Sequence, residues 1–241
     1  GASAILTDEE GELILKGLKI DALIVKKDAR RALAQAASLF MEEQPETIIA
    51  ITGTNGKTSV ASFCRQLWNE VGIQAINIGT TGVEGSWSAP LNYTTPDPVK
   101  LHQVLHKAAL EGITHVAMEA SSHGLDQRRL DGVEIKTTAF TNFSRDHLDY
   151  HVSYEEYFNA KKGLFERLCP KEKVGVFNID NREIKDLADW YALNNHVLTI
   201  GHDETADLVI LSQKFYPKSQ DIRFSFRNKI YQKTINLIGA F

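Results

Sequence analysis

The stretch "TIIAITGTNGKTSV", residues 47–60, predicts a strand, a glycine-containing loop and the start of a helix in direct succession. Its first residues are mostly β-branched and apolar, which is typical of a short strand buried on both faces. Gly53 and Gly56 allow the backbone to approach an anion closely and to point its N–H groups at it. Lys57 can reach the β and γ phosphates of a nucleotide, and the Thr58 hydroxyl can ligate Mg²⁺. The stretch therefore predicts a phosphate-binding loop at the carboxyl end of a strand.

The spacing of the two glycines departs from the common nucleotide-binding loop. That loop follows the pattern Gly-x-x-x-x-Gly-Lys-Ser/Thr, whereas Gly53 and Gly56 enclose only Thr54 and Asn55. An ordinary glycine-rich turn between a strand and a helix is the alternative at this point. Other residues must therefore decide whether the loop serves a nucleotide.

The composition limits the class of protein. A chain of 241 residues is long enough for one large domain, or for one domain and a piece of another. Its 27 basic and 31 acidic residues give a net charge of -4, which provides no electrostatic footprint for DNA or for an anionic membrane surface. Cys64 and Cys169 lie far apart without a disulfide or zinc spacing, and the longest apolar runs are strand-sized. We therefore expect a soluble, cytoplasmic monomer whose partners include neither nucleic acid nor a membrane.

The order of the remaining segments indicates the fold class. From Thr47 onward, β-rich runs alternate with helical patterns, which predicts an α/β fold with a mainly parallel sheet flanked by helices. Near the end of the chain, residues 221–237 alternate apolar and polar side chains around an Arg-Asn-Lys turn, which predicts a small antiparallel hairpin. Parallel strands are expected at 47–52, 74–78, 114–120, 136–143, 173–179, 196–200 and 207–213.

The helices between these strands carry start and stop signals. Asp97 and Pro98 have the order of an N-cap and a first-turn proline. Further helices are expected over residues 153–165 and 182–192. The helix that begins at Asp97 has an apolar stripe of Leu101, Val104, Leu105 and Ala108. The helix that follows the glycine loop should end at Gly72 and has apolar residues at helical spacing, namely Val60, Phe63, Cys64, Leu67 and Val71.

The first part of the chain contains too little apolar sequence to form its own core. Residues 21–26 are strand-like, residues 28–40 predict an Ala-rich helix, and residues 42–46 are a polar linker. We therefore expect residues 1–45 to be the tail of a preceding domain and residues 46–241 to form the nucleotide-binding domain.

Two further residues at strand ends are candidate metal ligands. In an open α/β sheet, ligands gather outside the carboxyl ends of the strands. Glu119 lies at the end of the strand expected at 114–120, and His147 follows the strand expected at 136–143. Mg²⁺ prefers oxygen ligands, so Glu119 fits it better than His147 does. A solvated carboxylate, and a histidine that only forms hydrogen bonds, are the alternatives.

Two longer strings supply a family context. "MEASSHGLDQRRL", residues 118–130, and "TNFSRDHLDYHVSYEEYFNAKKGLF", residues 141–165, occur together with "GTNGKTS" and "YTTPDP". In this combination they resemble the Mur ligases, and most closely the E-type enzymes that add the third residue of the peptidoglycan stem peptide. The resemblance runs in order from about Gly1 to Phe241 and includes the short Gly-x-x-Gly-Lys-Thr loop.

The resemblance implies a role for each candidate residue. ATP would be bound by the loop residues Gly53, Thr54, Asn55, Gly56, Lys57, Thr58 and Ser59. The UDP-sugar peptide would be held by Thr94, Thr95, Ser121, Gln127 and Arg129. One Mg²⁺ would be held by Thr58 and Glu119, and a second by His147 and a carbamylated Lys161. Catalysis would then rest on Lys57, Lys161 and His147.

The modified lysine is chosen by its spacing in "AKKGLF", because Lys162 follows Lys161 directly. A free ammonium group cannot ligate a cation, but a neutral lysine amine that captures CO₂ becomes an anion whose oxygen donors suit Mg²⁺. Gly163 is unusual inside an expected helix, where it costs about 1 kcal/mol relative to Ala. No feature of the sequence explains it.

The reaction that the resemblance implies is ATP-dependent amide formation on UDP-N-acetylmuramoyl-L-alanyl-D-glutamate. The substrate carboxylate would first receive the γ-phosphoryl group, and the acyl phosphate would then be attacked by an incoming amino acid, either diaminopimelate or lysine. Residues 1–45 would be the C-terminal part of a UDP-binding N-terminal domain with its linker, and residues 46–241 the central ATP-binding domain. "INLIGAF", residues 235–241, resembles the crossing into a C-terminal ligase domain, which we expect to be absent. Such a chain alone is expected to bind nucleotide weakly and not to ligate.

Two other classes of function are open at this stage. A ligase similar to folylpolyglutamate synthase shares the loop and the acyl phosphate chemistry, although it gives no reason for "SSHGLDQRR" or "TTPDP". A non-catalytic ATP-binding module would lack a modified lysine. A substrate screen tests the first class, and the intact mass in the presence of bicarbonate tests the second.

Overall fold

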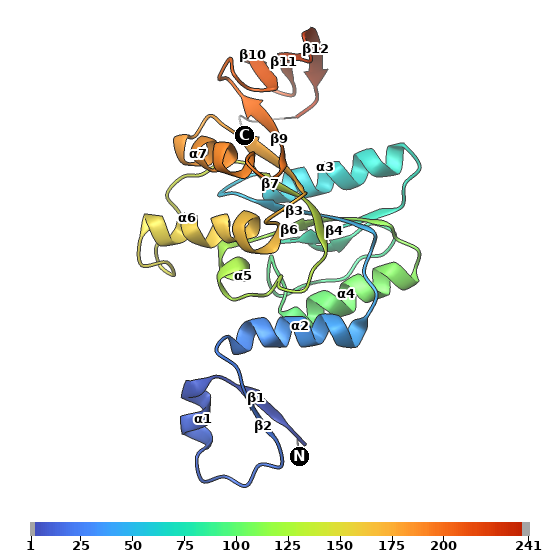
Figure 1. Ribbon diagram of the computed structural model, residues 1–241. Helices are drawn as coiled ribbons and strands as arrows, with labels where there is room; N and C mark the ends of the chain where they lie inside the picture. Colours follow the sequence, from blue (N-terminus) through green and yellow to red (C-terminus); the bar gives the residue numbers. More distant parts are fainter. Residues whose placement is uncertain (1–2, 238–241) are drawn as a thin grey trace.

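The structure, a computed structural model, describes residues 3–237 and is built around one large sheet (Figure 1). The ten-stranded sheet has the order β12-β11-β10-β9-β8-β7-β3-β6-β4-β5, and a separate two-stranded sheet pairs β1 with β2. The strands are β1 (Ile5–Thr7), β2 (Leu23–Val25), β3 (Thr47–Thr52), β4 (Ala75–Gly79), β5 (Gly82–Glu84), β6 (His115–Glu119), β7 (Ile135–Phe140), β8 (Val174–Asn178), β9 (His196–Gly201), β10 (Leu208–Phe215), β11 (Gln220–Phe226) and β12 (Lys229–Ile235). The helices are α1 (Glu9–Leu15), α2 (Ala29–Met41), α3 (Lys57–Glu70), α4 (Pro98–Leu110), α5 (Ser122–Asp126), α6 (Tyr154–Gly163), α7 (Arg182–Tyr191) and the π-helix η1 (Leu164–Leu168).

The central part of the large sheet is parallel. From β10 across to β4 each strand runs parallel to its neighbours. At the two edges, β5 and the pair β11 and β12 are antiparallel. Because β3 lies between β6 and β7, the order of the strands reverses beside it, and ligands of such sheets bind at that point. The predicted α/β class, the mainly parallel sheet and the C-terminal hairpin are confirmed.

The hairpin between β11 and β12 turns at two residues with positive φ. Arg227 has a φ of 50° and Asn228 a φ of 60°, and Phe226 pairs with Lys229 across the turn. Two successive positive φ values match the right-handed twist of the flanking strands. The structure describes this segment up to residue 237, so the last residues of "INLIGAF", 238–241, lie outside the described residues.

Helix α4 forms as its sequence signals predict. The Asp97 carboxylate accepts a hydrogen bond from the Lys100 N–H at 3.0 Å, and Pro98 occupies the first turn. Its buried side chains include the whole predicted stripe of Leu101, Val104, Leu105 and Ala108. The segment with Thr94 and Thr95, which precedes this cap, is therefore attached to a firmly packed helix.

Helix α3 buries only part of the apolar stripe that its spacing predicts. Phe63 is 40% exposed, Leu67 67% and Val71 72%. Ala61 is buried instead, and Val60, Cys64 and Trp68 pack beside it against a small core formed by Ile51 and Ala117. The helix and its end at Gly72, which has a φ of 81°, are predicted correctly, but the exposed members of the stripe are a correction. The face of α3 that covers the sheet is narrow because small residues allow the helix to approach closely.

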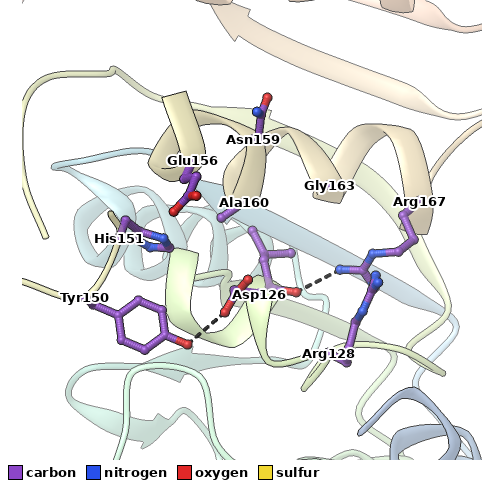
Figure 2. A pocket seen from close by; sticks show the side chains of 10 residues that line it. Asp126, Arg128, Tyr150, His151, Glu156, Asn159, Ala160, Gly163 and Arg167 are labelled. Atoms are coloured by element: carbon purple, nitrogen blue, oxygen red, sulfur yellow. Dashed lines mark hydrogen bonds between the residues drawn. The ribbon is translucent and has the colours of Figure 1, made fainter. Parts of the chain in front are cut away.

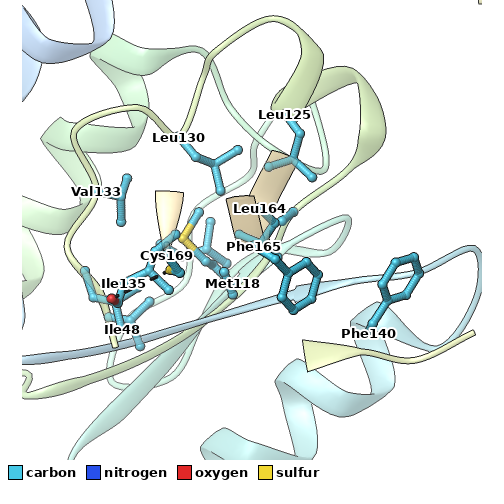
Figure 3. Close-up of a cluster of buried hydrophobic side chains, with 14 of the residues drawn as sticks. Ile48, Met118, Leu125, Leu130, Val133, Ile135, Phe140, Leu164, Phe165 and Cys169 are labelled. Atoms are coloured by element: carbon cyan, nitrogen blue, oxygen red, sulfur yellow. Dashed lines mark hydrogen bonds between the residues drawn. The ribbon is translucent and has the colours of Figure 1, made fainter. Parts of the chain in front are cut away.

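The main hydrophobic core lies on the opposite side of the sheet from α3. It joins strand residues such as Ile48, Met118 and Phe140 to Leu125 of α5 and Phe165 of η1 (Figure 3). A fully buried side chain of this size contributes about 1.5–3 kcal/mol by leaving water. This core fixes α5 and the α6–η1 segment against the sheet. Both segments carry candidate site residues or lie next to them.

The helix expected over residues 153–165 changes its hydrogen bonding part-way along. The Ser153 hydroxyl accepts from the Glu156 N–H at 3.1 Å and begins α6, which ends at Gly163 and continues as the π-helix η1. Gly163 therefore lies at the junction of two helix types, where the backbone changes its pattern. A Cβ at this glycine would lie 3.7 Å from Arg167 Nη2, an ordinary contact, so space alone does not require it.

Helix α2 packs against α4 and against the loop that precedes β7. Ala34 and Ala37 are buried, and the Ser38 hydroxyl donates to the Gly132 carbonyl at 2.9 Å. Gln44 Nε2 donates to the same carbonyl at 2.8 Å. The domain assignment of residues 1–45 stays a prediction. Within this range, α2 packs against α4, one of the helices that cover the large sheet. Within residues 3–237, every helix is too short or too polar to cross a membrane.

Candidate active site

The glycine loop lies between β3 and α3 and is held by the segment that follows β7. Gly53 has a φ of 144° and Gly56 a φ of 81°, values that L side chains rarely adopt. A Cβ on Gly53 would lie 2.0 Å from Thr141 Oγ1, so this position also requires the absence of a side chain. The Asn55 N–H donates to Asn142 Oδ1 at 2.9 Å, and Thr141 Oγ1 donates to the Asn55 carbonyl at 2.6 Å. The loop is therefore preformed by contacts from a second strand end.

Lys57 lies back across this loop. Its Nζ donates to the carbonyls of Gly53 at 3.0 Å and Thr54 at 2.9 Å. Burial lowers the pKa of Lys57, while the charges of Glu119 and Asp146 act in the opposite direction. An ammonium group whose partners are two neutral carbonyl oxygens can exchange them for a more strongly bound anion.

Thr58 and Glu119 meet directly at the carboxyl ends of β3 and β6. The Thr58 hydroxyl donates to Glu119 Oε1 at 2.8 Å, and the Thr80 N–H donates to the same oxygen at 2.8 Å. Glu119 is 2% exposed. A Cβ on Gly79 would lie 2.0 Å from Glu119 Oε1, so only glycine leaves room for this carboxylate. The structure therefore brings the two residues predicted to hold one Mg²⁺ into direct contact, while their role as ligands stays a prediction.

A cavity of about 840 Å³ opens beside this pair. It brings together most of the residues predicted to bind ATP and the UDP-sugar peptide. Its lining consists of Thr54, Asn55, Gly56, Lys57, Thr58, Thr80, Tyr93, Thr94, Thr95, Glu119, Ser121, His123, Gln127, Arg129 and His147. Three predicted residues lie outside this lining: Gly53 begins the loop, Lys161 contacts the Gly53 carbonyl from behind the loop, and Ser59 lies in the first turn of α3.

The five residues predicted to hold the substrate form one connected wall of the cavity. Thr95 Oγ1 donates to the Glu119 carbonyl at 2.8 Å and accepts from the Ser121 N–H at 3.0 Å. Arg129 Nη1 donates to the Thr95 carbonyl at 2.7 Å. Arg129 also donates to Gln127 Oε1 from Nε at 3.2 Å and from Nη2 at 2.7 Å. Thr94 Oγ1 lies 3.0 Å from Thr80 Oγ1, which completes the wall beside the candidate metal pair.

Lys161 is buried behind the loop, whereas Lys162 is at the surface. Lys161 is 1% exposed, its Nζ donates to the Gly53 carbonyl at 2.8 Å, and it lies 4.5 Å from the centre of the Tyr157 ring. Burial and the charge of Lys57 lower the pKa of Lys161 to about 7, against the opposing charge of Asp146. Lys162 Nζ instead pairs with Glu166 at 2.7 Å. A lysine that is partly neutral near pH 7 has the nucleophilic amine that CO₂ capture requires.

His147 faces the cavity, and its ring, like the Lys161 amine, lies near the Tyr157 ring. Its ring centre lies 5.9 Å from that of Tyr157 and 5.1 Å from that of His123, and its φ is 52°. His147 Nε2 lies 3.6 Å from the Asp146 carboxylate. Among residues 3–237, no group of three or more His, Cys, Asp or Glu side chains is arranged to hold a metal ion. The ligands predicted for the two metal sites include Thr58 and Lys161, which do not belong to those four residue types.

Several residues of the site were missed in the sequence. Thr80 follows the strand that ends at Gly79, and Asp146 precedes His147, so position after a strand end is a signal that could have identified both. Tyr157 lies four residues before Lys161 on α6 and therefore on the same helix face. Tyr93, whose ring lies 4.8 Å from the Arg129 guanidinium, carries no such signal because its contact is set by the path of a loop.

The comparison with known families agrees with this geometry. A family profile described as the Mur ligase middle domain matches residues 51–241. The chain belongs to the Mur ligase family. The match begins within β3 and covers the glycine loop, Glu119, His147 and Lys161. The predicted family is confirmed.

Relatives within the Mur ligase family include proteins whose names state an activity. A protein of Rhizobium meliloti (strain 1021) named UDP-N-acetylmuramoyl-L-alanyl-D-glutamate--2,6-diaminopimelate ligase is 44% identical over 244 residues, which covers 100% of this chain and 49% of that protein. A solved structure of a ligase with this name has a TM-score of 0.80 and 30% identity, and the match covers 90% of this chain and 45% of that chain. The chain spans about half the length of the curated relatives it matches.

The fold is also found outside the peptidoglycan ligases. The structure of a Mycobacterium tuberculosis folylpolyglutamate synthase complexed with ADP has a TM-score of 0.62 and 14% identity, over 81% of this chain and 50% of that chain. At this level of identity the likeness concerns the fold alone. The alternative of a folylpolyglutamate synthase-like ligase therefore gains no functional support from it, since the family match and the closer sequence relatives lie with the Mur ligases.

Proposed function

We propose that the chain is the ATP-binding part of a ligase that adds the third amino acid to UDP-N-acetylmuramoyl-L-alanyl-D-glutamate through an acyl phosphate. The observation that carries this proposal is the arrangement around Gly53. Lys57 and Lys161 both donate to its carbonyl, at 3.0 Å and 2.8 Å, beside the bonded pair of Thr58 and Glu119. A phosphate loop, a buried lysine of lowered pKa and a metal-binding carboxylate are the parts that phosphoryl transfer to a carboxylate needs.

The residues of the loop have separate tasks in this reaction. The N–H groups of Thr54 and Asn55 donate to Asn142, so the phosphates would be met by those of Lys57 and Thr58 in the first turn of α3, where the helix dipole also favours an anion. Lys57 would leave its two carbonyl partners for the β and γ phosphates and would neutralise charge as the γ-phosphoryl group moves to the substrate carboxylate. The contacts from Asn142 and Thr141 would keep the loop in place during this exchange.

The donor set at the first metal position fits Mg²⁺. Thr58 and Glu119 offer a hydroxyl and a carboxylate oxygen, and the space that Gly79 leaves holds the carboxylate in position. Mg²⁺ is commonly bound through one or two carboxylates together with substrate phosphates and water. When bound, it would supply neutralisation of charge on the phosphate oxygens. Thr58 and Glu119 would orient its ligands from the ends of β3 and β6.

The second metal position would use His147 and Lys161 as a carbamate. The buried amine of Lys161 fits this modification, because its lowered pKa leaves a share of it neutral at pH 7. The ring of Tyr157 lies against both residues and would separate the carbamate from bulk water. Thr94, Thr95, Ser121, Gln127 and Arg129 would hold the UDP-sugar peptide in the cavity.

The incoming amino acid is proposed to be diaminopimelate. The names of the relatives support this choice over lysine, since relatives at 44% and 46% identity are named as 2,6-diaminopimelate ligases. We further propose that residues 1–45 belong to a UDP-binding N-terminal domain with its linker and residues 46–241 to the central domain. A monomer in the cytoplasm, with ATP and Mg²⁺ as cofactors, completes the proposal.

The decisive experiment replaces Lys57 in the full-length protein that carries this sequence. With ATP, Mg²⁺ and UDP-N-acetylmuramoyl-L-alanyl-D-glutamate, the acyl phosphate can be trapped with hydroxylamine and quantified. Lys57→Ala should abolish trapping while its circular dichroism stays unchanged, and the surface variant Lys162→Ala should keep it. Acyl phosphate formation by Lys57→Ala would show the assignment to be wrong. A folate substrate in the same assay tests the folylpolyglutamate alternative, and a protein that traps nothing but binds ATP would be the non-catalytic module.

A further inference from the structure

The Gln127 side chain joins the wall of the cavity to a second pair of residues behind it. Its Oε1 accepts both hydrogen bonds from Arg129, at 3.2 Å and 2.7 Å. Its Nε2 donates to Tyr150 Oη at 3.0 Å, and Tyr150 Oη donates to Asp126 Oδ2 at 2.8 Å. Figure 2 shows the bond between Tyr150 and Asp126. Four side chains therefore form one linear series of hydrogen bonds that ends at Arg129.

The direction of this series follows from what each group can donate. An ionised carboxylate only accepts, so Tyr150 gives its single hydroxyl hydrogen to Asp126. The Tyr150 oxygen can then only accept from Gln127, and only the NH₂ end of the Gln127 amide can donate to it. The carbonyl end of the amide is therefore turned toward Arg129, whose guanidinium has donors alone.

Neither Tyr150 nor Asp126 lines the cavity that holds Gln127 and Arg129. They line a neighbouring cavity of about 480 Å³, which is shown in Figure 2. The Tyr150 ring is fixed there by His123 and His151, with ring centres 4.0 Å and 4.9 Å away. Tyr150 can therefore influence a ligand in the larger cavity by hydrogen bonding through Gln127 or by packing against His123, which lines that cavity.

We propose that Tyr150 and Asp126 are positioning residues that lock the orientation of the Gln127 amide, and through it hold the Arg129 guanidinium ready for an anionic group of the UDP-sugar peptide. This inference rests on the proposed function of the cavity. With the Arg129–Thr95 bond of 2.7 Å added, three N–H groups of the guanidinium are fixed, and its other donors are left for a ligand. If the amide turned over, its NH₂ group would oppose the guanidinium, and two sets of donors would face each other without an acceptor.

The first test is the Tyr150→Phe variant of the full-length protein, which removes one hydroxyl and keeps the ring. The dissociation constants of UDP-N-acetylmuramoyl-L-alanyl-D-glutamate and of ADP are measured by calorimetry. We expect the constant for the UDP-dipeptide to rise about three-fold to ten-fold, the range of one lost hydrogen bond, and the constant for ADP to stay unchanged. Asp126→Ala should give the same change, and the double variant no more than either single one, because both act in one series. An unchanged constant for the UDP-dipeptide in Tyr150→Phe would overturn the inference.

The second test separates positioning from packing. In Gln127→Glu both oxygens of the side chain accept, so its orientation toward Arg129 no longer depends on Tyr150. Gln127→Glu lowers substrate affinity by itself, but adding Tyr150→Phe to it should then cause no further loss. The same three-fold to ten-fold loss in both backgrounds would show that Tyr150 acts by packing alone. A wild-type protein that binds ADP but not the UDP-dipeptide would overturn the proposed function itself, a result distinct from the failure of this inference.

Discussion

Gly79 shows how one missing side chain shapes the site. It ends β4 next to Glu119, and any Cβ there would overlap the carboxylate that also accepts from Thr58. The sequence offers Thr58 as a candidate because it follows Gly-Lys in the phosphate loop, and Glu119 because it ends a strand, but it gives no sign that Gly79 makes room for them. Contacts between residues 40 positions apart depend on strand order, which local spacing does not encode.

Gly79→Ala is expected to weaken Mg²⁺-nucleotide binding at least about ten-fold, the loss that removal of one charged hydrogen bond causes. The matched control is Gly112→Ala. Gly112 has a φ of 76° with open space around it, so alanine there costs about 1–2 kcal/mol of stability and leaves the site intact. Calorimetric titration with MgADP and denaturant unfolding measure both effects. Equal nucleotide affinity in the two variants would contradict the role of Gly79.

Lys161 should make the stability of the fold depend on pH. Its pKa is lowered from 10.5 to about 7, so between these values the unfolded chain binds a proton that the folded chain does not. The free energy of unfolding therefore rises with pH in this window, and the penalty is fully present below about pH 7. In metal-free buffer without bicarbonate, Lys161→Met should lose this rise and exceed the wild type in stability at pH 7.

The control for this pH dependence is Lys162→Met, which removes a surface lysine paired with Glu166. It should keep the wild-type slope of unfolding free energy against pH. Denaturant titrations at several pH values between about 7 and 10 give the slopes. Identical slopes for the wild type and Lys161→Met would show that this lysine does not carry the lowered pKa.

At the scale of elements, strong local signals were sufficient for most helices and strands. The capping pair of Asp97 and Pro98 and the cap at Ser153 predicted the starts of α4 and α6 correctly. Short elements such as β5 and α5 were not predicted, because three to five residues hold too few positions for a period. The buried face of α3 was partly wrong because an apolar stripe indicates a helix, whereas the depth of its packing depends on the small Ala61.

The N-cap of α4 provides a prediction about an element and the site beside it. Asp97→Ala removes the acceptor of the Lys100 N–H and should cost about 1 kcal/mol of stability. Asn181→Ala removes the corresponding cap of α7, where the Asn181 side chain accepts from the Ile184 N–H at 3.2 Å, together with its Nδ2 bond to the Phe143 carbonyl at 3.2 Å, and should cost at least a similar amount. Only Asp97→Ala should also weaken binding of the UDP-dipeptide, because Thr95 lies two residues before this cap. Equal affinity of both variants for the UDP-dipeptide would show that the start of α4 does not influence the substrate site.

At the scale of the whole molecule, the site exists because the sheet reverses its order at β3. The reversal brings the ends of β3, β6 and β7 to one edge, and with them the loop, Glu119 and the segment with His147. The alternation of strands and helices in the sequence predicts this class of sheet and therefore the edge. It does not predict that Tyr150 reaches Gln127, or that the His147 ring lies near the Tyr157 ring, because Tyr150 and His147 are placed by the path of a loop.

Helix α2 should unfold together with the large sheet. Gln44 ties the segment after it to the Gly132 carbonyl at 2.8 Å and accepts from the Glu134 N–H at 3.1 Å. Gln44→Ala removes these two bonds and a third from Gln44 Nε2 to Ser38 Oγ at 3.1 Å, and it should raise hydrogen exchange in α2 about ten-fold or more while β3 and β6 stay protected. Mass spectrometry of exchanged peptides measures this. Early exchange of α2 in the wild type, before any change in the sheet, would instead assign α2 to a separate unit.

The Gly53 carbonyl, which both lysines contact, can report the state of the site spectroscopically. Two lysine donors on one oxygen polarise its C=O bond and lower the vibrational frequency of that single peptide group. Departure of Lys57 toward a phosphate removes one donor, and conversion of the Lys161 amine to a carbamate places an anion beside the carbonyl. Isotope-edited infrared spectroscopy of a ¹³C label at this position can therefore distinguish the empty, nucleotide-filled and modified forms in solution, without a dye and without a change of sequence.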